Sequence, residues 1–150
     1  MKLDTSAIIK GMIAGFVATV ALSALMVIKK MMGVMPELDP VGMISTMAAQ
    51  KMQTEPNIVI GWVMHFIIGS IMWGGAFAVL NNFLPSNNQV TKGIIFGIGA
   101  WLIMMVIPMP MSGAGLFGMN LGMMAPVMTL VLHIIFGVVL GATYSKLIAE

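Results

Sequence analysis

The chain has 150 residues, of which 59% are hydrophobic and only 8% are charged, and its formal net charge is +2. Soluble domains carry about 25% charged residues, so this composition excludes an ordinary soluble domain and indicates an integral membrane protein. Cysteine is absent, which excludes disulfides, thiolate metal sites and cysteine nucleophiles. The lysines form no basic stripe, so nucleic acid is not an expected partner.

Apolar stretches long enough to cross a hydrocarbon core of about 30 Å, which takes about 20 helical residues, occur four times. They are continuously apolar and lack the alternation of membrane strands. We therefore expect an all-α integral membrane protein with a single transmembrane domain over residues 1–150. The expected transmembrane helices are residues 7–28, 58–80, 93–109 and 124–148.

The first apolar stretch carries small residues at intervals of four, namely Gly11, Gly15, Thr19 and Ser23. This spacing puts them on one face of a helix, where another backbone can approach closely. After this stretch, Asp39 is a typical N-cap and Pro40 a typical first helical residue. We expect a helix near residues 40–53 that lies along the membrane surface. Its apolar side carries Val41, Ile44, Met47, Ala48 and Met52, and its polar surface elsewhere carries Ser45, Thr46, Gln50 and Gln53.

Two short patterns each occur twice. Lys-Gly-x-x-x-Gly opens the first and third stretches, and His-x-x-x-Gly lies in the second and fourth, as His65 to Gly69 and His133 to Gly137. The repetition predicts two repeated helical hairpins that enter the membrane with the same polarity. Both histidines then lie in the same leaflet and face the bundle interior, and the predicted packing glycines are Gly11, Gly15, Gly69, Gly137 and Gly141.

The histidine pair is the main functional hypothesis, because ionisable groups inside a membrane are expensive to keep. Three interpretations stand side by side. The histidines can be structural and bond a backbone carbonyl or hydroxyl, such as that of Thr129 one turn before His133. They can ligate haem b or another metal between two helices of the bundle, or they can transfer protons.

Methionine clusters near the histidines, with sixteen of the nineteen between Met26 and Met64 or between Met104 and Met128. Thioether and imidazole ligands suit Cu(I), but methionine is also a flexible filler of apolar gaps. The candidate metal ligands are His65, His133, Met109 and Met111. The glycine-rich segment 111–122 is expected to be a loop that dips back into the bundle.

No motif supports catalysis, since neither a Gly-x-Ser-x-Gly elbow nor a His-Glu-x-x-His pair is present. The chain is expected to be a binding or accessory membrane protein that holds haem b or a metal at His65 and His133. One alternative is a small proton or solute conduit that uses the same histidines without a cofactor. A second alternative is copper handling by the methionines.

Five short motifs are distributed along nearly the whole chain. They are Lys10-Gly-x-x-Ala-Gly15, Met35-Pro36-Glu37-Leu38-Asp39, Gly61-Trp-x-x-His65-Phe-x-x-Gly69, Met109-Pro-Met111 and Pro126-x-Met-x-Leu-x-Leu-His133. This layout resembles an uncharacterised family of small bacterial four-span inner-membrane proteins, and more loosely YagU-type membrane proteins. The resemblance implies a four-helix inner-membrane fold and no assigned activity, cofactor or catalytic residue.

The lysine distribution favours a cytoplasmic location for both termini. In that orientation four lysines lie inside and three, Lys29, Lys30 and Lys51, lie outside, which slightly favours it by the positive-inside rule. The expected location is the bacterial inner membrane. The expected partner is the lipid bilayer, with a homo-oligomer or a larger membrane complex as open alternatives.

Overall fold

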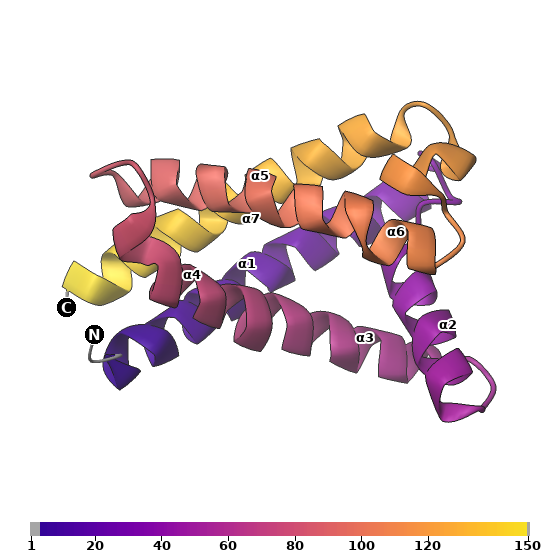
Figure 1. Cartoon of the computed structure of the whole chain (residues 1–150), viewed down its shortest axis with the longest axis horizontal. Coiled ribbons are helices and arrows are strands. Elements are labelled where there is room, and N and C mark those ends of the chain that lie inside the picture. The colour runs from indigo at the N-terminus through magenta and orange to yellow at the C-terminus, as the bar shows by residue number, and fades with distance from the viewer. Residues whose placement is uncertain (1–3, 150) are drawn as a thin grey trace.

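The computed structural model describes residues 4–149, and this part of the chain is helical without any strand (Figure 1). The elements are α1 (Thr5–Met31), α2 (Pro40–Met52), α3 (Ile58–Ile67), the π-helix η1 (Ile68–Gly74), α4 (Gly75–Leu80), the short 3-10 turn η2 (Asn81–Phe83), α5 (Gln89–Val106), α6 (Pro108–Met111), the 3-10 segment η3 (Leu116–Leu121) and α7 (Ala125–Ala149).

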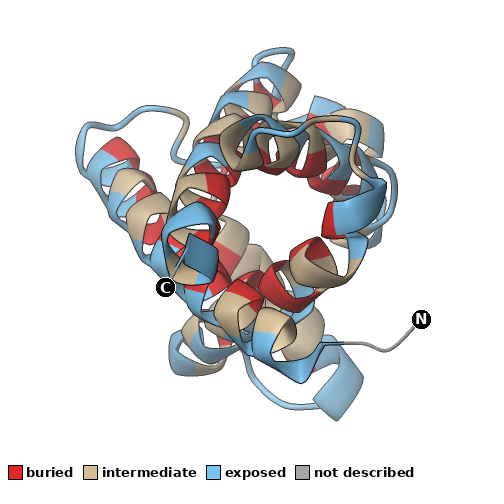
Figure 2. Ribbon diagram, turned by 90° about the vertical axis from the view of Figure 1, so that its left-hand side faces the viewer, coloured by how far each residue is buried: buried red, intermediate tan, exposed pale blue. Residues whose placement is uncertain are grey.

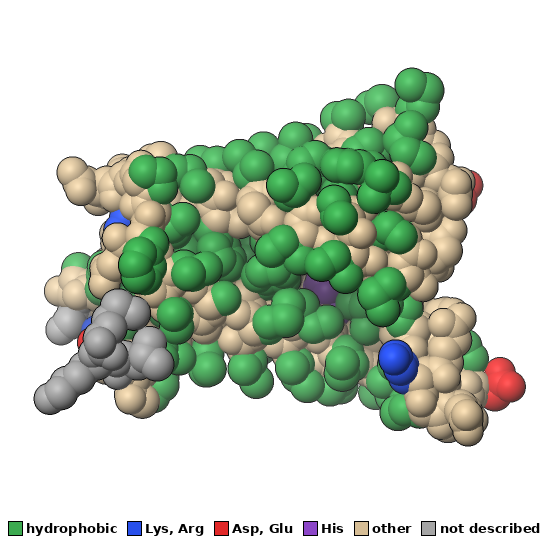
Figure 3. All heavy atoms as spheres, in the orientation of Figure 1, with side chains coloured by type: hydrophobic (Ala, Val, Ile, Leu, Met, Phe, Trp, Pro, Cys, Tyr) green, Lys and Arg blue, Asp and Glu red, His purple; other side chains and the backbone are tan. Residues whose placement is uncertain are grey.

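Four helical segments in this part of the chain are long and apolar enough to cross a membrane: Thr5–Met31, Ile58–Phe83, Gln89–Met111 and Ala125–Ala149. They confirm the four predicted spans, each with slightly different ends. Hydrophobic side chains cover the flank of the bundle, and the charged side chains lie toward its two ends (Figure 3). This distribution suits a bundle whose flank contacts lipid.

Side-chain caps explain where several of the helices begin. Asp39 accepts a hydrogen bond from the Gly42 N–H at 3.0 Å and Pro40 is the first residue of α2, as predicted. Asn57 caps α3 and Asn88 caps α5 in the same manner. Each cap satisfies an N–H group that has no partner within the helix, so the breaks between helices are encoded locally.

The helices pair as the two predicted hairpins. α1 packs against η1 and α4, α5 packs against α7, and contact between α1 and α7 joins the two pairs. The view along the bundle shows the helices around a common centre, with the buried residues turned inward (Figure 2). The described ends of the chain lie at the same end of the bundle (Figure 1).

Aromatic packing closes the bundle between the second and third spans. The Phe96 ring lies 5.8 Å from the Trp73 ring and 5.4 Å from the Phe77 ring, and Tyr144 lies 5.3 Å from Phe77. Phe77 has no exposed surface. Edge-to-face pairs of this kind add to packing energy, so this cluster, which we call the aromatic core, holds the end of the bundle near the termini.

Helix α2 packs against α3 through Val41, Ser45 and Ala49, which are the buried residues of α2. The prediction that Ser45 lies on the exposed side is therefore wrong. The physical reason is the small residue opposite: a Cβ atom at Gly61 would lie 2.5 Å from the Val41 carbonyl oxygen. Close backbone approach favours small residues over the larger apolar ones at this contact.

The segment after α5 consists of short helical turns, whereas the sequence predicted a loop at residues 111–122. Pro108 cannot continue the hydrogen-bond ladder of α5, so the helix ends at Val106 and α6 begins at Pro108. Met109 and Ala114 are buried together with Leu38 and Met105. The segment therefore packs onto the connection between α1 and α2 at the end of the bundle opposite the termini.

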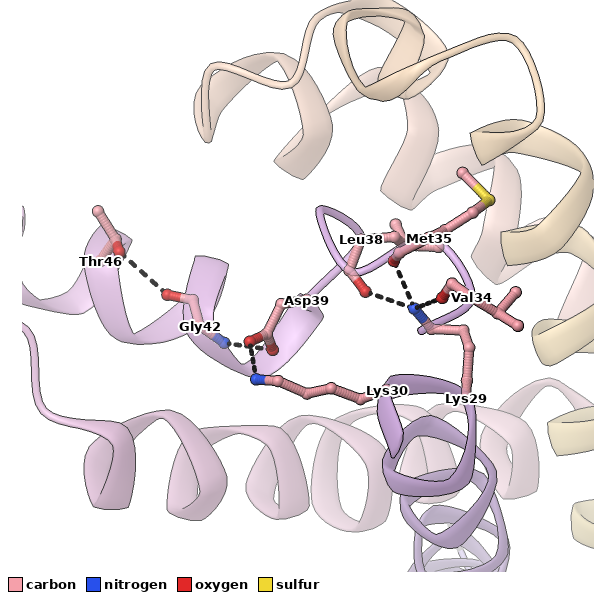
Figure 4. A network of polar contacts seen from close by, with 8 residues as sticks. All are labelled: Lys29, Lys30, Val34, Met35, Leu38, Asp39, Gly42 and Thr46. Atoms are coloured by element: carbon pink, nitrogen blue, oxygen red, sulfur yellow. Dashed lines mark hydrogen bonds and ion pairs between the residues drawn. The ribbon is translucent and has the colours of Figure 1, made fainter. Parts of the chain in front are cut away.

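Lys29 organises the connection between α1 and α2 (Figure 4). Its ammonium group is almost buried and donates to the carbonyl oxygens of Val34, Met35 and Leu38 at 3.0, 2.8 and 3.0 Å. Lys30 instead lies 2.8 Å from the Asp39 carboxylate. These bonds fix Leu38 in the core and set the start of α2 across the bundle.

Candidate functional site

His65 on α3 and His133 on α7 line the same internal cavity, which has a volume of about 110 Å³. All four spanning segments contribute to its wall, and so does α2. We call it the histidine cavity. Its lining is otherwise apolar or weakly polar, and includes Thr19, Met26, Trp73, Met104, Thr129 and Phe136. The structure therefore brings together the two histidines that the sequence singled out.

Thr129 orients the imidazole of His133. The Nδ1 atom of His133 lies 2.8 Å from the Thr129 carbonyl oxygen, one turn earlier in α7. A carbonyl oxygen only accepts, so Nδ1 carries the hydrogen and Nε2 of the neutral ring keeps a lone pair. Hydrogen bonding of one ring nitrogen to a carbonyl is a common way to present the other nitrogen to a metal.

The side-chain hydroxyl of Thr129 is also held by hydrogen bonds. Its hydroxyl accepts from the Trp101 indole N–H at 3.0 Å and donates to the Ala125 carbonyl at 2.8 Å. These bonds link α5 to α7 next to His133. The predicted structural bond between His133 and Thr129 is thus present, and it uses only one nitrogen of the ring.

His65 is held by rings and has an unpaired nitrogen. Trp62 and Phe66 present their rings edge-on to the imidazole at 5.8 and 5.9 Å. His65 is 9% exposed, and its buried Nε2 atom has no hydrogen-bond partner in the part of the chain that the structure describes. A buried polar atom without a partner costs about 1 to 3 kcal/mol, so Nε2 of His65 is a candidate ligand-binding atom.

The two candidate methionines differ in how far they are buried. Met109 is buried next to the cavity but does not line it, and Met111 is 59% exposed. Met26 and Met104, which the sequence analysis did not single out, line the cavity with the histidines. Helical spacing contained the signal: Met26 follows Ser23 on the small-residue face of α1, and Met104 lies one turn after Ala100.

The predicted packing glycines lie at the helix contacts that place these side chains. Gly11 and Gly15 on α1 face the backbone of η1, where Gly69 packs against Thr19. In the second hairpin, Gly137 and Gly141 on α7 face the start of α5. A further glycine, Gly97 on α5, faces the His133 carbonyl, so the glycine contacts of this hairpin continue to the histidine.

The histidine cavity continues sideways into a second hollow. This lateral groove has a volume of about 360 Å³ and lies between α2, the α3–η1 segment and the end of α5. It shares Pro40, Ile44, Ile68, Trp73 and Met104 with the histidine cavity. Histidine surface is visible between α3 and α5 in Figure 3. The cavity is therefore reachable from the flank of the bundle.

A polar pocket of about 220 Å³ adjoins the groove where α2 begins. It shares Met43, Met47 and Ser112 with the groove and is also lined by Glu37, Asp39, Gly42, Thr46 and Gln50. Burial raises the pKa of Asp39, but hydrogen bonds from Lys30 and from the Gly42 N–H outweigh it, so the pKa lies below its ordinary value. The pocket thus carries carboxylate charge.

Residues 5–150 match the family described as "Family of unknown function (DUF6789)". The chain belongs to this family. The match agrees with the resemblance to an uncharacterised family, while similarity to YagU-type proteins stays a prediction. No curated protein and no solved structure matches the chain.

For this member of DUF6789, the chemistry of the site is set by neutral ligands. No cluster of three or more His, Cys, Asp or Glu suited to a metal ion occurs among residues 4–149. The groups that the cavity offers are imidazole nitrogen, thioether sulfur and threonine oxygen. This set favours soft ions over Ca²⁺ and Mg²⁺, which prefer carboxylate and carbonyl oxygen.

Proposed function

We propose that this protein is a membrane-embedded binding protein that holds a soft monovalent metal ion, Cu(I), in the histidine cavity. The observation that carries the proposal is the convergence of His65 and His133 on one cavity, with Nε2 of His65 buried and unpaired. The candidate ligands are the Nε2 atoms of both histidines and the thioethers of Met26 and Met104. Imidazole and thioether together are typical ligands for copper in its reduced state.

The charge of the site favours a monovalent ion. Among residues 4–149, no carboxylate lines the histidine cavity, so the charge of a bound ion is not neutralised by these ligands. Burying a charge in an apolar environment is expensive and the Born cost rises steeply with the size of the charge. Cu(I) therefore fits this cavity better than Zn²⁺ or Cu²⁺.

Haem b does not fit the histidine cavity. At about 110 Å³, the cavity lies below the range of about 300 to 1,000 Å³ that small-molecule and cofactor sites occupy. A haem would have to fill the lateral groove as well. We therefore leave haem b out of the proposal.

A proton or solute conduit is supported less well. A conduit needs a path through the bundle, and the aromatic core fills the bundle between the histidine cavity and the end where the termini lie. Phe136 is buried in the same cluster as Phe77 and Phe96 and also lines the cavity, so the packed region begins at the cavity wall. The cavity opens sideways instead, toward the lateral groove.

We place the protein in a bacterial inner membrane with both termini in the cytoplasm and the histidine cavity toward the outer side. The described ends of the chain share one end of the bundle (Figure 1). Lys10 lies near the start of α1, Lys92 near the start of α5 and Lys146 near the end of α7, which are the helix ends on that side. The two outer lysines next to the first span have structural partners, since Lys29 binds three carbonyls and Lys30 binds Asp39. A homo-oligomer or larger membrane complex remains part of this proposal.

The proposal is tested by anaerobic titration of the purified protein with Cu(I) in competition with a chromophoric chelator. We expect one ion per chain. His65→Ala and His133→Ala should each weaken binding by more than about 10-fold, because even supporting residues of metal sites change affinity by about 10- to 100-fold. A visible spectrum of the protein as purified, if it shows a Soret band, would favour haem over this proposal.

A matched pair of methionine variants provides the control. Met104→Leu removes a cavity thioether and should weaken Cu(I) binding, whereas Met111→Leu makes the same change on the exposed surface and should leave it unchanged. Both replacements conserve volume, so the fold should survive them. Equal affinity in the parent and in both histidine variants would contradict the proposal.

A further inference from the structure

Two connected hollows, one apolar and one polar, lie at the end of the bundle that carries α2. The lateral groove is lined by hydrophobic side chains except for Ser112, and the polar pocket carries Glu37, Asp39, Thr46 and Gln50. They share Met43, Met47 and Ser112, so a single molecule can extend from one into the other. An elongated site with one apolar and one polar part matches an amphiphile.

The size of the groove limits the apolar part of that molecule. Small-molecule sites have volumes of about 300 to 1,000 Å³ and are mostly apolar with a few polar groups. At about 360 Å³, the groove is at the low end of this range. It therefore suits one acyl chain, while a second chain of the same lipid would lie in the surrounding bilayer.

The charge of the polar pocket limits the head group. In the described part of the chain, Glu37 and Asp39 are the ionisable residues that line the pocket, and no lysine lines it. The ammonium group of Lys30 reaches one oxygen of Asp39, and the other oxygen accepts from the Gly42 N–H. Glu37 is exposed at the pocket. A head group with a donor and positive charge is thus favoured, and an anionic one is repelled.

We propose that the lateral groove and the polar pocket together bind one membrane phospholipid with a primary-amine head group. One acyl chain lies in the groove beside Met43, Met47 and Trp73, and the ammonium group of an ethanolamine head lies at the carboxylate of Glu37. The side-chain amide of Gln50 is available to donate to the phosphate. This inference is independent of the metal proposal.

Occupation of the groove would also close the side entrance of the histidine cavity. The cavity and the groove share Met104, Ile44 and Ile68, so an acyl chain in the groove covers the opening between them. The lipid would then exclude water from His65 and His133. A bound lipid and a bound metal ion can therefore coexist.

Trp73 offers a direct readout, because it lines the groove. In a variant with Trp62→Phe and Trp101→Phe, Trp73 is the only tryptophan that remains among the three in the chain. The probes are two lysophospholipids with the same brominated acyl chain, one with an ethanolamine head and one with a glycerol head, added to the protein in detergent. Bromine quenches tryptophan fluorescence at close range.

We expect saturable quenching, with half-saturation at a concentration at least about five-fold lower for the ethanolamine lipid, since charge-assisted hydrogen bonds are the strong ones. Glu37→Gln should remove most of this preference. Glu55→Gln, which makes the same change outside the pocket, should retain it. The double variant Glu37→Gln, Asp39→Asn should abolish the preference for the ethanolamine lipid. Because asparagine also caps helices, α2 should keep its N-cap in this variant.

Three results would overturn the inference. The first is quenching that rises linearly with both lipids, as expected for lipid that merely surrounds the bundle. The second is equal half-saturation for the two head groups, and the third is a preference that survives Glu37→Gln. If the double tryptophan replacement unfolds the protein, native mass spectrometry of the parent with the same two lipids gives the same comparison, and equal retention of both lipids would overturn it.

Discussion

The two ends of the bundle differ in how tightly their side chains pack. At the end near the termini, Phe77, Phe96 and Tyr144 pack edge-to-face, and each of them is at most 6% exposed. At the other end, methionines, histidines and the turns between helices leave a cavity, a groove and a polar pocket. We infer that the tightly packed end supplies stability, while the other end holds the cavities at which we propose binding.

The largest effect that tests this division should come from the aromatic core. Phe77→Ala removes a fully buried ring that touches Phe96 and Tyr144, and should lower the free energy of unfolding by about 3 kcal/mol. Phe83→Ala, at a ring that is 67% exposed, is the matched control and should have little effect. The measurement is thermal unfolding in detergent.

If Phe77→Ala also abolishes Cu(I) binding in protein that is still folded, packing at one end of the bundle is not independent of binding at the other. The account expects the affinity of the folded variant for Cu(I) to remain near that of the parent, because Phe77 does not line the histidine cavity. A loss of affinity together with retained helicity would show that the two ends are not separable.

A smaller effect should come from the glycine contact that joins the two ends. A Cβ atom at Gly97 would overlap the His133 carbonyl, whereas one at Gly99 on the same helix meets open space. Gly97→Ala should therefore cost about 1 to 3 kcal/mol and weaken Cu(I) binding by moving His133. Gly99→Ala should be neutral or slightly stabilising, by about 0.4 to 1 kcal/mol, because it restricts the unfolded chain.

Thermal unfolding and Cu(I) titration of Gly97→Ala and Gly99→Ala test whether this glycine contact positions His133. If Gly97→Ala lowers stability but leaves the affinity unchanged, then the position of His133 does not depend on the glycine contact. Equal behaviour of the two alanine variants would show that α5 and α7 do not approach as closely as described.

The smallest effect should come from the start of α2. Asp39→Ala removes the N-cap and should cost about 1 kcal/mol, whereas Asp39→Asn keeps a capping side chain and should cost less. The pKa of Asp39 lies below its ordinary value of 3.8, so its contribution to stability is present above that pH and is lost as the pH falls through the lowered value.

Unfolding of the parent and of Asp39→Asn over acidic pH would check the sign. The stability of the parent should fall more steeply below about pH 4 than that of Asp39→Asn, in which the group cannot titrate. Identical pH profiles would mean that Lys30 and the Gly42 N–H do not stabilise the charged carboxylate.

The sequence predicted the spans, the paired hairpins and the cap of α2, because these depend on local features. Span length follows from a long apolar run, and the cap follows from Asp39 next to Pro40. The matching glycine patterns indicated which helices pair. Each of these signals lies within a few residues or within one repeat, so no tertiary information was needed.

The walls of the site could be predicted only in part. His65 and His133 were found because a histidine is conspicuous in an apolar run. Met26 and Met104 were missed among the nineteen methionines, although helical spacing puts each of them in line with small residues of its helix. The π-helix η1 and the buried Ser45 arise from close contact between helices. Such contacts depend on the tertiary arrangement, and the local sequence does not encode them.

The central claim is that His65 and His133 hold one ion together. X-ray absorption at the copper edge of Cu(I)-loaded protein tests it most directly, because imidazole nitrogen and thioether sulfur scatter differently. The account predicts imidazole and sulfur in the same first shell, and loss of the imidazole signal along with the bound copper in the His65→Ala, His133→Ala double variant. A sulfur-only shell, or a spectrum unchanged in the double variant, would contradict it.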